Sequence, residues 1–165
     1  MLLSVIVPTL LDPHVLNLVA SYHNKQKDIY FKSELILVYP SSLSPQQIQV
    51  LGRISGFSFK NFSVQLLPGG DTIYSAMNIG LSKALGEWLF FQGDTDSFNF
   101  TILEILSTIS ASKIDLFLGP ILKSGKVIAP KYHFPSPTRV CFERNSLPHQ
   151  SIIYSRELLI RSSIR

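Results

Sequence analysis

The sequence has very little cysteine: Cys141 is the only one among 165 residues. A single thiol excludes a disulfide within the chain, and no spacing of cysteine and histidine matches a zinc site. Long apolar runs are lacking too, because residues 1–7 and 116–122 fall far short of the ~20 residues that a bilayer span needs. The first run has no basic residues before it and leads into Pro8, which favours a core strand over a signal peptide. These absences predict a cytoplasmic protein without a transmembrane helix.

Basic clusters are also absent, although the net charge is +4. A positive net charge favours anionic partners such as nucleotide phosphates, lipid phosphates or a membrane surface. The lysines and arginines are scattered, and no basic stripe carries interleaved aromatic residues, which argues against nucleic-acid binding. The charge is therefore compatible with a small phosphorylated ligand and with contact at the inner face of a membrane.

Apolar runs that stop at proline or glycine alternate with stretches of helical periodicity over the first two-thirds of the chain. The runs predict strands at residues 2–9, 34–39, 63–67 and 87–92. A first helix is expected after Asp12, with Asp12 as its cap and Pro13 as its first residue. Further helices are expected over residues 45–54, 71–85 and 98–110.

The last third of the chain has a different pattern. Residues 116–123 and 126–129, joined by Ser124 and Gly125, predict a β-hairpin across a tight turn. Loop-like sequence then extends from Lys131 to the apolar stretch 152–160. Because strands alternate with helices before this region, the predicted fold class is α/β: a Rossmann-like, mostly parallel sheet with helices on both faces and a C-terminal β-hairpin.

Ligands of such sheets bind at the carboxyl ends of the strands. Pro8 and Thr9, residues 39–42 and residues 93–96 all lie at such ends. We therefore expect these three loops to converge on one crevice.

The sharpest local motif is Asp94-Thr95-Asp96, which follows a predicted strand and Gly93. Two carboxylates one residue apart can share Mg²⁺ or Mn²⁺, directly or through water. The alternative is that they turn the chain and cap the next helix. The position at a strand end leaves both interpretations open.

Three further features have both a binding and a purely structural interpretation. Residues 68–71 (Pro-Gly-Gly-Asp) precede a predicted helix, where they form either an anion site or an ordinary turn. Tyr74 and Asn78 share a helix face that could meet a base or ribose, or else serve in the core. His149 and Gln150 could bind a metal or an acceptor hydroxyl, or make hydrogen bonds within a loop.

Four blocks in order resemble the GT-A glycosyltransferases of family 2, the inverting enzymes that in bacteria build polysaccharides and modify lipid carriers. The long middle block is the most specific, because its Tyr-Ser-Ala-Met-Asn helix is followed by the Asp-Thr-Asp turn. The blocks are residues 4–9 (SVIVPT), 34–38 (ELILV), 70–96 and 148–151 (PHQS).

The resemblance implies a nucleoside-diphosphate sugar as donor, a saccharide or lipid-linked acceptor, and Mg²⁺ or Mn²⁺ as cofactor. It implies that Asp96 ligates the metal with Asp94 beside it, and that His149 and Gln150 face the acceptor or the diphosphate. No catalytic base is nominated, because the acids beyond the metal turn stand in no recognisable context. The candidate nucleotide-sugar site comprises Pro8, Thr9, Tyr39, Gly70, Tyr74, Asn78, Asp94 and Thr95.

The chain also departs from the family. Residues 39–42 (Tyr-Pro-Ser-Ser) stand where the family carries an acid for the base, and Ser75 replaces the aspartate of Tyr-Asp-Ala-Met-Asn. The family domain continues beyond the His-Gln block, so one GT-A-like domain over residues 1–165 that lacks the usual C-terminal part is expected. Two functions stay open: a metal-assisted hexosyltransferase-type enzyme, and an inactive transferase-fold binding or scaffold subunit that pairs with a partner or a second copy.

Overall fold

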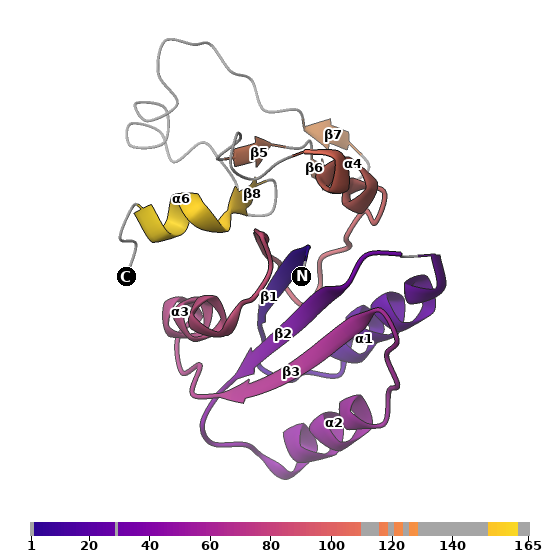
Figure 1. The fold of residues 1–165 in the computed structure, drawn as a ribbon. Coiled ribbons are helices and arrows are strands. Elements are labelled where there is room, and N and C mark those ends of the chain that lie inside the picture. Colours follow the sequence, from indigo (N-terminus) through magenta and orange to yellow (C-terminus); the bar gives the residue numbers. More distant parts are fainter. Residues whose placement is uncertain are drawn as a thin grey trace.

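A mostly parallel sheet forms the centre of the computed structural model, which describes residues 2–28, 30–109, 116–118, 121–123, 126–128 and 152–161. Six strands follow the order β3-β2-β1-β4-β8-β5 (Figure 1). The first four are parallel, whereas β8 is antiparallel to both β4 and β5. The strands are β1 (Leu3–Pro8), β2 (Ser33–Tyr39), β3 (Phe62–Pro68), β4 (Trp88–Phe91), β5 (Leu116–Leu118) and β8 (Ile152–Ser155).

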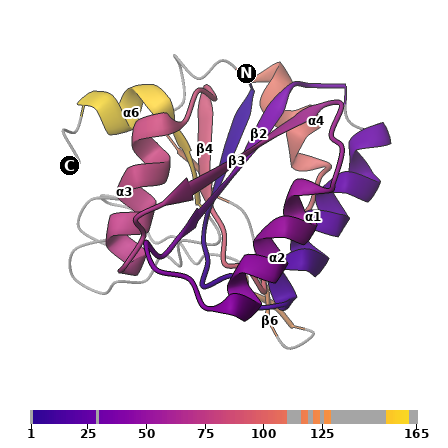
Figure 2. The same cartoon turned by 90° about the horizontal axis from the view of Figure 1, so that it is seen from below.

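Helices cover both faces of the sheet, as the sequence predicts. Figure 2 shows α1 and α2 on one side and α3 and α6 on the other. Buried residues of α4 join the same apolar cluster as those of α1 and α2. The helices are α1 (His14–Lys25), followed by the short 3₁₀ helix η1 (Gln26–Asp28), α2 (Pro45–Ser55), α3 (Ile73–Lys83), α4 (Ile102–Thr108) and α6 (Arg156–Arg161).

Strands β1 and β2 are buried on both faces, which explains why their sequences are largely apolar. Val5 is in register with Leu35, and both face the cluster under α1, α2 and α4. The next pair along the strands, Ile6 and Ile36, faces the cluster under α3 and α6. The alternation of side chains along a strand thus divides one apolar run between two cores.

Helix α3 lies very close to β1 at Gly80. A Cβ atom added to Gly80 would stand 2.3 Å from Cγ2 of Ile6, which is fully buried. Ala76, one turn earlier, is buried on the same face of the helix. Small residues at these two positions therefore set the distance between α3 and the sheet.

A polar cluster is buried near the amino end of the central strands. Glu34 has no exposed surface and accepts hydrogen bonds from the Ser4 hydroxyl, the Gln65 side chain (2.8 Å) and the Leu85 N–H (2.5 Å). The Gly86 N–H donates in turn to Oγ of Ser4, at 2.7 Å. These bonds hold the loop between α3 and β4 against β1 and β2.

Two helix starts differ from the sequence prediction. Pro13 occupies the N-cap position of α1 without a side-chain cap, and Asp12 contributes its main-chain carbonyl to Val15 at 3.0 Å. Asp12 is therefore not the expected cap. Helix α3 begins at Ile73, two residues after the predicted start, because the Thr72 and Ser75 side chains each accept from the other residue's N–H in a capping box.

The predicted helix over residues 98–110 is also too long. Helix α4 begins at Ile102, and two residues before it, Phe98 and Phe100, instead pack their rings against the buried ring of Tyr22. The rings of Phe98 and Phe100 lie 6.1 and 4.9 Å from the ring of Tyr22, measured between centroids. Packing of these two half-buried rings against Tyr22 of α1 thus overrides the helical pattern of the sequence.

The predicted C-terminal hairpin is confirmed in part. Strands β6 (Ile121–Lys123) and β7 (Lys126–Ile128) pair antiparallel, with Lys123 opposite Lys126 across the expected turn. The first three residues of the predicted first hairpin strand (116–123), however, form β5 and join the main sheet beside β8. Among the helices that the structure describes, none has both the length and the apolar composition that a bilayer crossing requires.

Candidate functional site

The carboxyl ends of β1, β2 and β3 form one continuous rim. Pro8 ends β1, Tyr39 ends β2, and their neighbours join the strands beyond the regular ladder. The Thr9 N–H donates to the Val38 carbonyl at 2.9 Å, and the Gly70 N–H donates to the Tyr39 carbonyl at 2.9 Å. The structure thus brings four of the predicted nucleotide-sugar residues to the same edge of the sheet.

The Asp-Thr-Asp turn joins this rim through Thr9. Its hydroxyl donates to Oδ2 of Asp94 at 3.0 Å and accepts the Leu11 N–H at 2.9 Å. Thr9 is almost fully buried, whereas Asp94 is half-buried and Thr95 is exposed. One threonine therefore holds together the loop that follows β1 and the turn that follows β4.

Asp96 closes the turn on itself. Its Oδ2 accepts the Gly93 N–H at 3.0 Å, and its own N–H donates to the Gly93 carbonyl at 3.1 Å. Neither carboxylate of the motif caps the next helix, because Thr101 occupies the N-cap position of α4. The capping interpretation of Asp94 and Asp96 is therefore wrong, while a role in closing the turn is observed.

Asp94 and Asp96 use the same carboxylate oxygen for their hydrogen bonds to other described residues. Within the described ranges, the hydrogen bonds to Asp94 and to Asp96 end on Oδ2 in both residues. Their Oδ1 atoms are hard oxygen donors of the kind that Mg²⁺ and Mn²⁺ prefer. The same ranges contain no group of three or more His, Cys, Asp or Glu side chains that could hold a metal ion.

Two buried residues, Gln92 and Tyr22, are linked to the Asp-Thr-Asp turn by hydrogen bonds. The Tyr22 hydroxyl donates to Oε1 of Gln92 at 2.7 Å, and Nε2 of Gln92 donates to the Asp96 carbonyl at 2.8 Å. Burial raises the pKa of Tyr22 well above its usual value, because the phenolate would lose its hydration. Neither residue is among the sequence-predicted site residues, although a glutamine at the end of an apolar strand was a usable signal.

Asp71 belongs to the Pro-Gly-Gly-Asp segment, for which the sequence left an anion site and an ordinary turn open. Its carboxylate accepts the Ser41 N–H at 3.0 Å and the Ser41 hydroxyl at 3.4 Å. The loop after β2 is thereby tied to the turn after β3. The Pro-Gly-Gly-Asp segment is in this respect a structural turn.

Tyr74 and Asn78 lie on the outer side of α3. Each is two residues from Ala76, which corresponds to about 200° around a helix, so both are opposite the face that packs on the sheet. Tyr74 is 73% exposed and Asn78 is exposed. The structure therefore rules out a core role for this pair. His149 and Gln150 lie outside the described residues.

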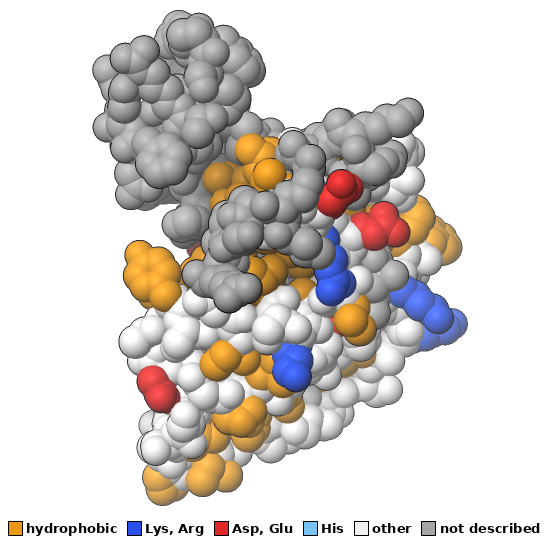
Figure 3. Space-filling view, turned by 60° about the vertical axis from the view of Figure 1, so that its left-hand side comes forward, with side chains coloured by type: hydrophobic (Ala, Val, Ile, Leu, Met, Phe, Trp, Pro, Cys, Tyr) orange, Lys and Arg blue, Asp and Glu red, His pale blue; other side chains and the backbone are white. Residues whose placement is uncertain are grey.

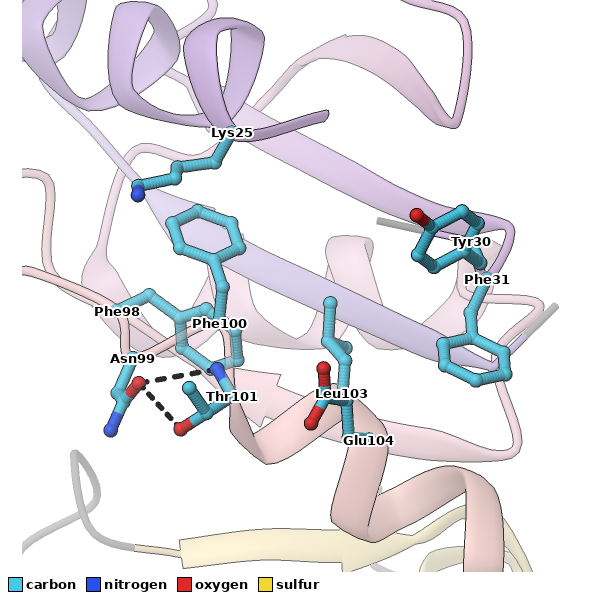
Figure 4. A pocket seen from close by; sticks show the side chains of 9 residues that line it. All are labelled: Lys25, Tyr30, Phe31, Phe98, Asn99, Phe100, Thr101, Leu103 and Glu104. Atoms are coloured by element: carbon cyan, nitrogen blue, oxygen red, sulfur yellow. Dashed lines mark hydrogen bonds between the residues drawn. The ribbon is translucent and has the colours of Figure 1, made fainter. Parts of the chain in front are cut away.

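A cavity of about 280 Å³ lies elsewhere, between the end of α1 and the start of α4. Figure 4 shows Tyr30 and Phe31 on one side of it and Phe98 and Phe100 on the other. Tyr30 and Phe31 precede β2, so the cavity is near the amino end of that strand. None of the sequence-predicted site residues lines it.

Comparisons with known proteins identify the fold. No family model matches the sequence, and no curated protein matches it. A crystal structure of TarS from S. aureus matches with 21% identity and a TM-score of 0.69 over 99% of this chain and 30% of that one. TarS 1-349 in complex with UDP-GlcNAc matches with 21% identity and a TM-score of 0.64 over 99% and 48%. The chain has the glycosyltransferase fold.

A third structure is more distant in sequence but similar in shape. The mannosyltransferase PcManGT from Pyrobaculum calidifontis, in complex with GDP-Man and Mn²⁺, has 13% identity and a TM-score of 0.61 over 97% of this chain and 46% of that one. The chain thus spans between 30% and 48% of the length of these three structures.

Proposed function

We propose that this chain binds a nucleoside-diphosphate sugar at the rim formed by β1 to β4 and transfers the sugar to an acceptor hydroxyl. One observation carries the proposal: the carboxylates of Asp94 and Asp96 stand on a turn that Thr9 connects to the end of β1. Matching folds contain UDP-GlcNAc in one case and GDP-Man with Mn²⁺ in another. The net charge of +4 also suits an anionic donor.

The donor set fits a hard divalent cation. Mg²⁺ is usually held by one or two carboxylates together with the phosphates of the substrate. Asp94 and Asp96 would supply those carboxylates, and the diphosphate of the donor would supply further oxygen ligands. A bound cation would offset the charge that develops on the departing nucleoside diphosphate. Metal and nucleotide are therefore proposed to bind cooperatively.

The remaining predicted residues receive proposed places around this centre. Pro8, Thr9, Tyr39, Gly70 and Thr95 are proposed to contact the nucleotide or its sugar from the rim. Tyr74 and Asn78 face outward from α3 and are assigned to the outer part of the donor. The proposed acceptor side is formed by His149 and Gln150. The acceptor is proposed to be a saccharide or lipid-linked hydroxyl, with inversion at the transferred sugar.

On the face seen in Figure 3, the described lysine and arginine side chains are dispersed, with acidic side chains near some of them, and do not form a compact cluster. Neutralisation of the diphosphate is therefore assigned to the cation rather than to a basic cluster. This assignment predicts a strong dependence of nucleotide affinity on metal.

Calorimetric titration with UDP, GDP, UDP-GlcNAc and GDP-Man tests the proposal. Mn²⁺ is expected to strengthen binding of the preferred nucleotide by about tenfold or more, which corresponds to ~1.4 kcal/mol. Asp96→Ala should remove that gain, whereas Asp12→Ala, at an exposed position, should keep it. Binding that ignores both Mn²⁺ and Asp96→Ala would contradict the proposal.

Release of UDP or GDP from the preferred donor separates transfer from binding. An active transferase should show slow donor hydrolysis by water that disappears in Asp96→Ala. Metal-dependent binding without any turnover, with or without saccharide acceptors, would instead favour the inactive binding subunit.

Gly93→Ala provides a second test of the turn. A Cβ atom at this position would stand 2.8 Å from Oδ2 of Asp96, so the carboxylate must leave its place beside the Gly93 N–H. We expect the Mn²⁺-dependent gain in nucleotide affinity to fall about tenfold, as for other changes to groups that orient a metal ligand. Affinity measured in EDTA should stay unchanged. Gly56→Ala, at an exposed position after α2, is the matched control.

A further inference from the structure

Gln92 occupies an unusual place for a polar side chain. It follows the last residue of β4, is 2% exposed, and precedes the turn that holds Asp94 and Asp96. Burying an amide among apolar groups is unfavourable unless its hydrogen bonds are made. Packing alone would favour an apolar residue here, as at the preceding four positions of β4. The polar contacts of Gln92 therefore call for an explanation.

The hydrogen bonds run from Tyr22 to Gln92 to Asp96, and donors and acceptors can be arranged along them in only one way. The Asp96 carbonyl can only accept, so Nε2 of Gln92 must face it, at 2.8 Å. Oε1 then faces the Tyr22 hydroxyl, which donates at 2.7 Å. Because its pKa is raised by burial, Tyr22 remains a donor throughout the physiological pH range. Rotation of the amide would place two oxygens together at Asp96, so a single orientation is selected.

Tyr22 itself is held firmly. Its ring lies 5.1 Å from that of Phe62 and 4.9 Å from that of Phe100 between centroids, both edge to face, and it has no exposed surface. Helix α1 thus presents a rigid hydroxyl group to Gln92.

These hydrogen bonds end on the main chain of Asp96, a proposed metal ligand. Asp96 is bonded on its other side to Gly93, through its own N–H and through Oδ2. With its carbonyl held by Gln92, both peptide groups of Asp96 are restrained. Its carboxylate is thereby kept in one place before any ligand arrives, which reduces the entropic cost of binding.

We propose that Tyr22 and Gln92 are positioning residues that fix the main chain at Asp96 and so set how tightly the turn holds a divalent cation. This role rests on the proposed function, since it concerns the cation of the nucleotide-sugar site. Both residues act through Asp96 and touch neither cation nor nucleotide.

Two variants that preserve shape test this role. Tyr22→Phe keeps the packed ring and removes only the hydroxyl, and Gln92→Met keeps most of the volume and removes the amide. We expect the Mn²⁺-dependent part of UDP or GDP affinity to fall about tenfold in Gln92→Met. The fall in Tyr22→Phe should be about threefold, because one net hydrogen bond is lost. Affinity for the same nucleotide in EDTA should change by less than about twofold in both.

The double variant and a matched control sharpen the result. If Tyr22 acts only through Gln92, Tyr22→Phe should cause no further loss of Mn²⁺-dependent affinity in a Gln92→Met background. Gln65→Met removes another glutamine amide, the one bonded to Glu34, and should leave the Mn²⁺ dependence unchanged. Equal losses with and without Mn²⁺, or additive losses in the double variant, would overturn the positioning role.

Amide hydrogen exchange provides a readout that needs no ligand. In the wild-type protein the N–H groups of Gly93 and Asp96 should be protected, and protection of both should fall in Gln92→Met while the amides of β2 keep theirs. Unchanged exchange at Gly93 and Asp96 would overturn the positioning role even where Mn²⁺ strengthens nucleotide binding. Absence of any Mn²⁺ effect in the wild type, with faster exchange in Gln92→Met, would instead overturn the proposed metal site and confine the pair to shaping the turn.

Discussion

Replacement of Glu34 by alanine is expected to lower the free energy of unfolding by about 3 kcal/mol or more, because an unsatisfied buried donor costs roughly 1–3 kcal/mol. Three donors would lose their acceptor together: the Ser4 hydroxyl, the Gln65 amide and the Leu85 N–H. All three reach a carboxylate that has no exposed surface. Denaturation by urea, followed by far-UV circular dichroism, measures the loss.

Two further variants show whether the hydrogen bonds, rather than the size of the side chain, account for the effect. Glu34→Gln keeps one oxygen that can accept from Ser4 and Leu85, and Gln65 can rotate its own amide to accept from the new N–H group of residue 34. We therefore expect a much smaller loss of stability. Glu87→Ala, at an exposed position, should change stability by less than about 0.5 kcal/mol. Equal losses in the alanine and glutamine variants of Glu34 would show that the three donors find other partners.

Gly80→Ala is expected to destabilise the protein by about 2 kcal/mol, because overpacking a close-packed interface costs roughly 1–3 kcal/mol. The new Cβ atom would stand 2.3 Å from Cγ2 of Ile6. Ile6 is β-branched and fully buried in a central strand, so its side chain has little freedom to move away. Helix α3 must then shift from the sheet.

Gly52→Ala is the matched comparison for this prediction. Gly52 is also in the middle of a helix, α2, but it is exposed and an added Cβ atom would meet nothing within 4 Å. Alanine favours a helix over glycine by about 1 kcal/mol, so this variant should be more stable than the wild type. Opposite signs for the same substitution in two helices are the expected thermal-unfolding result. Stabilisation by both would show that α3 adjusts freely.

The sheet was largely predictable from the sequence because its strands are buried on both faces. Continuous apolar runs such as residues 34–39 then coincide with strands, and proline or glycine marks their carboxyl ends. The order of the first four strands brought Thr9 and Asp94 to one edge, where a hydrogen bond joins them. Topology alone was sufficient to place these loops together.

The local contacts of the site were not predictable, since they depend on partners far away in the chain. The side chain of Gln92 is hydrogen-bonded to Tyr22, which lies 70 positions earlier in the sequence. The sequence around Gln92 contains no signal that identifies this partner. The apolar pattern of residues 98–110 fits a helix, yet Phe98 and Phe100 are used to pack against α1. Asp12 illustrates the converse, because a good capping residue contributes only its main chain.

The place of β4 in the sheet affects how the protein is made. Its neighbour on one side is β1, but its neighbour on the other is β8, with Trp88 opposite Ser155. During synthesis the four parallel strands can assemble first, and β4 is then an outer strand with unpaired main-chain groups. Such an edge is a template for pairing with other chains. That edge stays open until residues 152–155 are added and pair with it as β8, so the last of the described strands to be made covers the very strand that leads into the Asp-Thr-Asp turn.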